Sequence, residues 1–230
     1  MNQKRSKTSL LFDEDRAKNY DRFSQIWMPN YDVFCDWIPS ILANKYLRRG
    51  DKILAVGCGT ANEIISLLHS NEVWHITGID PSLEMLKVAK EKLKAYPTVS
   101  LIHGYVNDLP RIASFDGATL LLVLHFLPDD GQKLSLLKAI SGRLHRGAPL
   151  VIADIFGDKT ALESNLNFLV STLSGKVNPT EILERQQKIR NTIHYISEKR
   201  LEQLLQAAGF SSPHRLFQST IYGGWICTKL

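Results

Sequence analysis

The sequence predicts an α/β fold built around a parallel β-sheet. Strand-like and helix-like segments alternate from residue 52 onward, a pattern typical of βαβ units. Several strand-like segments are continuously apolar, as expected when helices cover both faces of a parallel sheet. The 230 residues suffice for one large domain with a substantial core, so we expect a single domain over residues 1–230.

The alternation predicts seven strands with helices between them. The strands are expected at residues 52–56, 74–79, 99–103, 116–124, 149–155, 214–219 and 225–228, and the intervening helices at 81–95, 129–145 and 197–208. Asp129 and Gln132 have the spacing of a capping box at the start of the second of these helices. The third is expected to begin at a Ser197 cap and to end at Gly209.

Two helical segments lie outside this alternation. Residues 9–48 are rich in aromatic side chains and precede the first strand. Residues 158–195 form an insert that is broken at Gly175 and restarts at Asn178 with a proline at the next position. Because extra elements beside a cofactor-binding sheet often build the substrate pocket, we expect a helical N-terminal lid and a helical insert.

Composition narrows the class of partner. The net charge of +5, from 28 basic and 23 acidic residues, is a mild excess, and much of it lies at Lys4, Arg5 and Lys7. This is too little to indicate a nucleic-acid partner, for which a clustered basic face is expected, although such a partner stays open. No apolar stretch reaches membrane-spanning length, and no secretory signal is visible. The three cysteines lack CxxC spacing, which argues against a disulfide framework or a zinc site. We therefore expect a cytoplasmic protein without a metal or a membrane partner; the oligomeric state stays open, a homodimer included.

A glycine turn and an acidic strand end carry the strongest functional signal. Gly57 and Gly59 follow an apolar strand and open a helix, and Asp80 ends the next strand. Glycines let the backbone approach a ligand, and a carboxylate there can accept both hydroxyls of a ribose. Asn62 stands where a dinucleotide fingerprint has its third glycine, so S-adenosylmethionine is favoured over a nicotinamide cofactor.

Motifs over about residues 50–230 together resemble the class I S-adenosylmethionine-dependent methyltransferases. The two most characteristic runs are Val56-Gly57-Cys58-Gly59-Thr60 and Gly78-Ile79-Asp80-Pro81, and the others lie at residues 103–110, 115–128, 144–150 and 197–210. The resemblance implies a Rossmann-like sheet of seven mostly parallel strands with an antiparallel terminal hairpin. Helices would cover both faces, and the activity would be methyl transfer from S-adenosyl-L-methionine.

The same resemblance implies a set of cofactor contacts. The glycine turn would face the methionine part, Asp80 the ribose, and residues 105–107 the adenine. The implied cofactor-binding residues are Tyr20, Gly57, Cys58, Gly59, Asp80, Pro81, Met85, Tyr105, Val106, Asn107 and Leu122. Two positions depart from the family pattern. The family usually has an acidic residue at the Ala55 position, so another group or water must serve the cofactor's ammonium. It often has a carboxylate at the Tyr105 position for the adenine amino group, where a tyrosine can stack or offer its hydroxyl.

On the acceptor side, His125 follows the fourth strand, where the family places residues that face the reacting methyl. A histidine there can act as a general base near neutral pH, although a helix-start role is an equal alternative. Tyr31 lies in an aromatic segment similar to the N-terminal lids of small-molecule and wobble-uridine-modifying members; core packing is its alternative. Tyr222 and Trp225, in an expected hairpin turn at residues 222–225, complete the expected substrate contacts.

The preferred interpretation is S-adenosylmethionine-dependent methyl transfer to a small-molecule acceptor. One alternative is a tRNA-modifying enzyme that uses the same or a modified cofactor. Others are a non-catalytic cofactor-binding protein and, less favoured, a nicotinamide dehydrogenase. The segment after the fourth strand lacks the Asn/Asp-Pro-Pro-aromatic motif of amino-methylating nucleic-acid enzymes, which counts against DNA adenine methylation.

Overall fold

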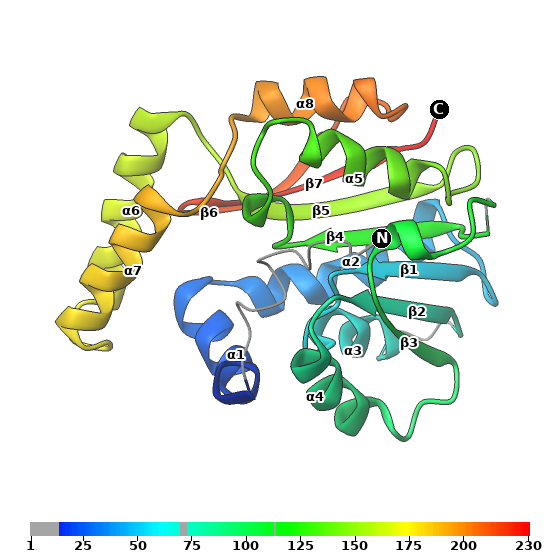
Figure 1. Cartoon of the computed structure of the whole chain (residues 1–230), viewed down its shortest axis with the longest axis horizontal. Coiled ribbons are helices and arrows are strands. Elements are labelled where there is room, and N and C mark those ends of the chain that lie inside the picture. Colours follow the sequence, from blue (N-terminus) through cyan, green and yellow to red (C-terminus); the bar gives the residue numbers. More distant parts are fainter. Residues whose placement is uncertain (1–13, 70–72, 113) are drawn as a thin grey trace, which may run out of the picture.

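The computed structural model describes residues 14–69, 73–112 and 114–230 and is built on a seven-stranded sheet (Figure 1). The strands are β1 (Lys52–Val56), β2 (His75–Asp80), β3 (Val99–His103), β4 (Gly117–Leu121), β5 (Pro149–Ile155), β6 (His214–Ser219) and β7 (Tyr222–Thr228). Their spatial order is β3-β2-β1-β4-β5-β7-β6. Neighbours from β3 to β5 are parallel, whereas β7 runs antiparallel to both β5 and β6. The predicted mostly parallel sheet with an antiparallel terminal pair is confirmed.

Helices cover both faces of this sheet. They are α1 (Glu14–Trp27), α2 (Tyr31–Lys45), α3 (Asn62–Leu68), α4 (Leu83–Leu93), α5 (Gln132–Ser141), α6 (Lys159–Leu173), α7 (Pro179–Asn191) and α8 (Glu198–Ala207), with short 3₁₀ turns at Val106–Asp108 and Leu124–Phe126. Along β1, Ile53 and Ala55 pack with α2, α3 and α4, while Leu54 and Val56 pack with α5 and α8. The alternation of side chains along a strand thus divides the core into two layers.

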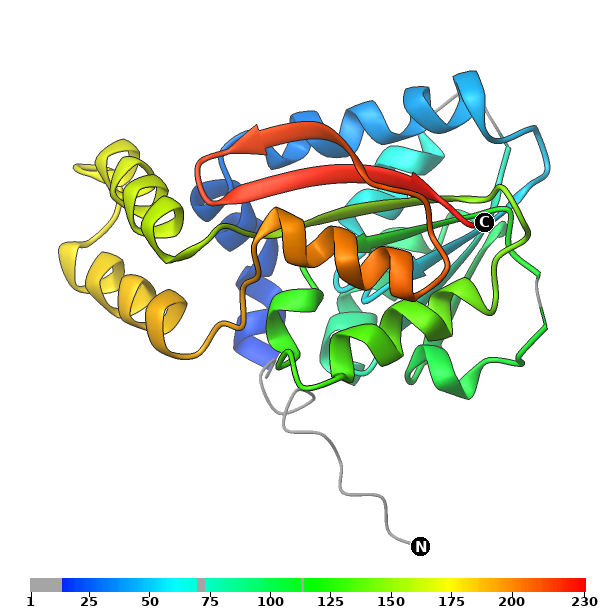
Figure 2. The same cartoon turned by 90° about the horizontal axis from the view of Figure 1, so that it is seen from above.

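The insert between β5 and α8 is helical, as predicted. Helix α6 ends before Gly175, and α7 restarts after Asn178, whose side chain accepts a hydrogen bond from the Thr180 amide at 2.9 Å. The pair α6 and α7 extends beyond the sheet at the end where the parallel strands finish, on the same side as α1 (Figures 1 and 2). The extra helices therefore gather at the edge where α/β proteins bind their ligands. Residues 9–13 of the expected lid lie outside the described residues.

The start of α5 differs from the predicted capping box. Gly131, with a left-handed φ of 107°, is the N-cap, and glycine has no side chain that could cap the helix. The Asp129 carboxylate instead pairs with both Nε and an Nη of Arg200 on α8, at 2.8 and 3.0 Å. This ion pair holds the Asp129 side chain against α8, and the Gln132 amide donates to the Asp130 carboxylate at 3.2 Å instead.

The terminal hairpin also turns earlier than predicted. The turn falls at residues 220–221, and Gly223 and Gly224 lie within β7, paired with both β5 and β6. A Cβ atom on Gly224 would lie 2.6 Å from the Phe34 ring, and one on Gly223 would lie 2.4 Å from the Trp225 ring. Gly224 therefore allows α2 to pack closely on the sheet, and Gly223 leaves room for the Trp225 and Phe156 rings; neither glycine lies in the turn.

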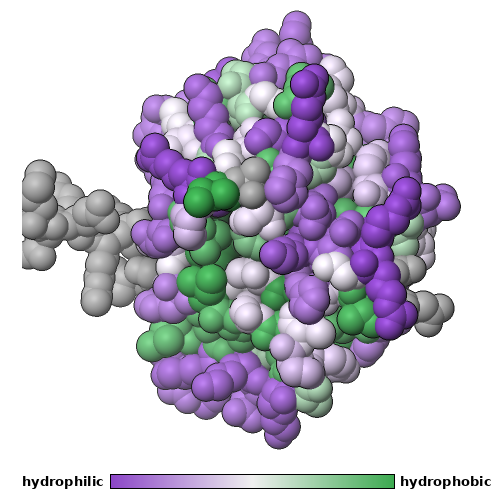
Figure 3. Space-filling model, turned by 90° about the vertical axis from the view of Figure 1, so that its right-hand side faces the viewer, coloured by the Kyte–Doolittle hydropathy of each residue, from purple (hydrophilic) through white to green (hydrophobic). Residues whose placement is uncertain are grey.

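The end of the molecule away from α6 and α7 has a mixed surface (Figures 1 and 3). Figure 3 shows it with hydrophilic side chains around a smaller group of hydrophobic ones. Among the helices of the described ranges, none has the length and apolar character needed to cross a membrane.

We predict that Gly224→Ala destabilises the fold by about 1–3 kcal/mol, because the added methyl overlaps the buried Phe34 ring. Urea unfolding measures the change. The double variant Gly224→Ala/Phe34→Leu should recover part of the loss, since leucine lacks the ring atoms that clash. An unchanged unfolding midpoint for Gly224→Ala would show that the ring shifts freely.

Candidate active site

A cavity of about 320 Å³ opens where β1, β2 and β4 end. All of the predicted cofactor residues except Cys58 line it, namely Tyr20, Gly57, Gly59, Asp80, Pro81, Met85, Tyr105, Val106, Asn107 and Leu122. Its volume and its largely apolar wall with a few polar groups are typical of a small-molecule site. We call it the cofactor cavity.

The glycine turn that ends β1 forms one wall of the cofactor cavity. Gly57 and Gly59 have left-handed φ values of 66° and 51°. A Cβ atom on Gly57 would lie 2.4 Å from a methyl of Val123, so no larger residue fits there. The Gly57 and Cys58 amides both donate to the Ile79 carbonyl, at 2.8 and 3.2 Å, which fastens the turn to β2.

Asp80, at the end of β2, is held by two backbone amides. One carboxylate oxygen accepts from the Gly59 amide at 2.9 Å and the other from the Ser82 amide at 2.8 Å. Burial raises the pKa of Asp80, and these two hydrogen bonds oppose the rise. Each carboxylate oxygen has two lone pairs, so both can still accept from a ligand. The site therefore fits the ribose of an adenosyl cofactor, with Met85 and Val106 as apolar wall for the base.

Cys58 does not line the cofactor cavity. Its side chain is buried, and its sulfur lies only 2.9 Å from where a Gly78 Cβ atom would stand. Burial raises the pKa of the thiol well above its usual value, so it is a poor nucleophile. Cys58 is a small core residue between β1 and β2.

Leu122, directly after β4, has a strained conformation. Its φ of 61° is left-handed, which is uncommon for a residue other than glycine, and its amide donates to the Ala153 carbonyl at 2.7 Å. The predicted strand 116–124 therefore stops at Leu121. Such strain concentrates at functional sites. Here it carries the chain out of the sheet and into the turn that bears His125.

A second cavity, of about 90 Å³, adjoins the first. The two share Tyr20, Leu122 and Phe126, and the second is enclosed by α1, α7 and the start of β7. His125 and Tyr222, two of the predicted catalytic and substrate residues, line it. We call it the acceptor cavity.

The other two predicted substrate residues line neither of these cavities. Tyr31, the first residue of α2, is buried in the core, where burial raises its pKa and its side chain contacts Cys35. Trp225 is 1% exposed, and its indole Nε1 donates to Glu198 at 2.7 Å. Both positions follow from packing: these aromatic side chains fill the space between helices and sheet.

His125 forms a buried pair with Asp154, a residue that the sequence reading missed. Nδ1 of His125 lies 2.6 Å from a carboxylate oxygen of Asp154, at the end of β5. Asp154 also accepts from the backbone amides of His125 and Ile155, at 3.2 and 2.7 Å. An ionised Asp154 can only accept, so neutral His125 carries its proton on Nδ1 and leaves Nε2 as the basic atom.

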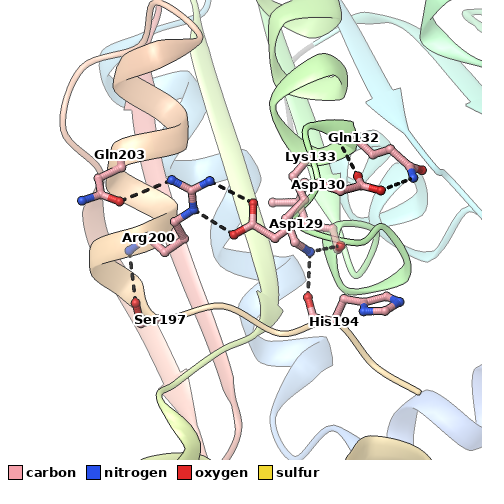
Figure 4. A network of polar contacts seen from close by, with 9 residues as sticks. Asp129, Asp130, Gln132, Lys133, His194, Ser197, Arg200 and Gln203 are labelled. Atoms are coloured by element: carbon pink, nitrogen blue, oxygen red, sulfur yellow. Dashed lines mark hydrogen bonds and ion pairs between the residues drawn. The ribbon is translucent and has the colours of Figure 1, made fainter. Parts of the chain in front are cut away.

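A buried lysine fixes the turn that carries His125 (Figure 4). Lys133, on α5, is fully buried and donates to the backbone carbonyls of Leu124 and His194, at 2.5 and 2.7 Å. Burial lowers its pKa, and the nearby carboxylates of Asp154 and Asp129 oppose this. The ammonium therefore joins α5, the turn after β4 and the end of the insert.

Helix α1 is fastened over the cofactor cavity by Asp21, also missed in the sequence. Its carboxylate accepts from the Thr60 hydroxyl at 2.5 Å, from the Asn62 amide at 3.0 Å and from the Lys92 ammonium. Asn62, where a dinucleotide fingerprint has glycine, thus binds the lid instead. This anchor places Tyr20 in the wall of the cavity.

Within the described residues, no cluster of three or more His, Cys, Asp or Glu side chains is placed to hold a metal ion.

Comparison with known proteins places this site in a family. Residues 53–147 match the family model described as "Methyltransferase domain". The chain is 25% identical to the Carboxy-S-adenosyl-L-methionine synthase of Campylobacter hominis, over 97% of this chain and 96% of that one. It is 29% identical to the Demethylmenaquinone methyltransferase of Staphylococcus aureus, over 84% and 81%.

Among solved structures, a putative S-adenosyl-L-methionine-dependent methyltransferase from Methanococcus maripaludis superposes with a TM-score of 0.64. It is 20% identical, and the match covers 100% of this chain and 95% of that one. The methyltransferase-domain match over residues 53–147 and the two relatives agree with the expected class of S-adenosylmethionine-dependent methyltransferase, and the solved structure shows the shared fold. The expected family, enzyme class and cofactor are thereby confirmed.

We predict that Asp80→Asn weakens binding of S-adenosylhomocysteine at least tenfold. Hydrogen bonds to a charged group contribute about 1.5–3 kcal/mol each, and the amide loses both the charge and part of the accepting capacity. Titration calorimetry gives the affinity, with Asp116→Asn, at the far end of the sheet, as control. Equal affinity for Asp80→Asn and wild type would mean that Asp80 only orders the turns.

A second prediction concerns Glu63, on the first turn of α3. It is 4% exposed, and burial raises its pKa from 4.5 to about 8, with Asp80 adding to the rise and Lys92 opposing it. Between these values the folded state binds a proton that the unfolded state has lost. The contribution of Glu63 to stability is therefore greatest at low pH and falls as the pH rises toward 8.

Glu63→Gln removes this titration. Relative to wild type, we expect the variant to gain stability between pH 5 and pH 8 by up to roughly 1.4 kcal/mol per pH unit. Chemical denaturation at the two pH values measures it, with the exposed Glu91→Gln as control. A stability difference that is the same at both pH values would contradict the buried, protonated state.

Proposed function

We propose that this enzyme transfers a methyl group from S-adenosylmethionine to a small molecule bound in the acceptor cavity. The observation that carries the proposal is the junction of the two cavities at Tyr20, Leu122 and Phe126. With the ribose at Asp80, the cofactor's reacting end lies toward this junction. An acceptor in the second cavity is then held in line with the methyl group.

The chain's own contribution is alignment, exclusion of water and proton removal. When bound, the cofactor supplies an electrophilic methyl on a sulfonium. A new bond forms between the acceptor's nucleophile and the methyl carbon, and the carbon–sulfur bond breaks with its electron pair left on sulfur. Nε2 of His125 takes the acceptor's proton, and Asp154 holds the imidazole in the required tautomer.

Ion pairs of surface arginines favour a small-molecule acceptor over nucleic acid. Arg190, Arg200 and Arg215 each pair with a carboxylate, of Glu163, Asp129 and Glu198 respectively. Such pairs neutralise charge that a nucleic-acid surface would keep free. The acceptor cavity itself is small, at about 90 Å³.

A second candidate is formation of a carboxylated cofactor. It is favoured by the full-length similarity to a protein named Carboxy-S-adenosyl-L-methionine synthase and by two cationic residues, Arg185 and Lys188, in the acceptor cavity.

The proposal is tested with S-adenosylmethionine labelled on its methyl group. The protein is incubated with a small-molecule extract and, separately, with total tRNA. Label should move to the small-molecule fraction. Label in tRNA, or no transfer at all, would contradict the proposal, and a cofactor that gains the mass of carbon dioxide would select the second candidate.

We predict that His125→Asn and Asp154→Asn lower turnover by about 10²–10⁴-fold while the affinity for S-adenosylhomocysteine stays unchanged. The first variant removes the base, and the second removes the charge that orients it. His214→Asn, on the exposed β6, is the matched control. Full turnover in both variants would assign the pair to structure alone.

A further inference from the structure

The wall that α7 contributes to the acceptor cavity is positively charged. Arg185 and Lys188 both line the cavity, among aromatic and aliphatic side chains from α1 and the sheet. Two carboxylates near this wall are already engaged: Glu181, one turn earlier on α7, accepts from the Trp27 indole at 3.3 Å, and Asp154 is paired with His125.

Arg185 differs from the arginines that pair on the surface. Across the described part of the chain, no carboxylate forms an ion pair with Arg185, and its buried Nε has no hydrogen-bond partner. Its guanidinium stacks over the rings of Phe23 and Trp27, at 4.7 and 5.9 Å. Stacking holds the plane of the group and leaves the donors on its edge available, the arrangement by which arginine binds carboxylates.

Tyr222 provides a second unsatisfied donor in the same cavity. Its side chain is 2% exposed, and its hydroxyl hydrogen has no acceptor among the described residues, because the Arg185 guanidinium beside it can only donate. Burial raises the pKa of Tyr222, and the nearby Arg185 charge opposes the rise, so the two groups act on one another. A buried donor without an acceptor costs about 1–3 kcal/mol, which a bound acceptor atom would offset.

We propose that the acceptor carries a carboxylate, which binds between the Arg185 guanidinium and the Tyr222 hydroxyl. The nucleophilic end of the same molecule then lies toward Tyr20 and Leu122, beside His125. This inference rests on the proposed methyl transfer and names its substrate class: a compact organic acid, or a larger molecule with a compact acidic end. Lys188, on the same face of α7, adds positive charge.

The test measures binding of matched acids and amides to protein saturated with S-adenosylhomocysteine. The probes are pyruvate with pyruvamide and benzoate with benzamide, titrated by calorimetry. At least one acid should bind tenfold or more tightly than its amide. Arg185→Gln should abolish that preference, Arg185→Lys should retain part of it, and Tyr222→Phe should weaken acid binding several-fold.

Two controls make the outcome specific. Arg190→Gln removes a cation from the same helix that is paired with Glu163, and it should leave acid binding unchanged. The affinity of Arg185→Gln for S-adenosylhomocysteine should equal that of wild type, which shows that the fold is intact.

The possible failures are distinguishable. No preference for either acid, or a preference that survives in Arg185→Gln, would overturn the carboxylate site and leave methyl transfer standing. Absence of S-adenosylhomocysteine binding would overturn the proposed function itself. Native mass spectrometry tests whether the carboxylate belongs to the cofactor instead. A co-purified cofactor that is heavier than S-adenosylmethionine by the mass of carbon dioxide, together with no binding of the acids, would assign Arg185 to the cofactor. That result would overturn the acceptor proposal.

Discussion

The carboxylate of Asp80 joins the two turns from which the cofactor site is made. One oxygen holds the Gly59 amide after β1, and the other holds the Ser82 amide at the start of α4. Because both strands end at the same edge of the sheet, a single buried group sets the position of the glycine turn and of the helix that follows β2. The other walls of the cofactor cavity include the strained Leu122 and the lid residue Tyr20.

The acceptor cavity exists because two helical additions are fastened to this base. Asp21 ties α1 to Thr60, Asn62 and Lys92, and Lys133 ties the turn after β4 to the end of the insert. Arg185 then stacks on α1 side chains from α7, so lid and insert meet over the reacting end of the site. Much of the wall of the acceptor cavity thereby comes from parts of the chain outside the regular βαβ alternation.

Much of the fold and of the cofactor site was readable from the sequence, because local chemistry determines them. Glycines at positive φ, apolar strands, the Ser197 cap and a carboxylate at a strand end are each set by neighbouring residues. Pairings between distant segments could not be predicted from the sequence. These pairings explain where the structure departs from the expected positions and why some residues of the site were not expected. The Asp129 carboxylate pairs with Arg200, the Trp225 indole donates to Glu198, and Tyr31 packs in the core. Asp154, Asp21 and Arg185 were given no role in the site, since their partners lie on other elements.

The central claim is that an adenosyl cofactor binds against Asp80 with its reacting end at the junction of the two cavities. The most direct measurement is a crystal structure of the protein with S-adenosylhomocysteine. The ribose hydroxyls should lie within hydrogen-bond distance of Asp80, the adenine between Met85 and Val106, and the sulfur beside Tyr20 and Leu122. A ligand bound elsewhere, or one whose sulfur faces away from the acceptor cavity, would contradict the account.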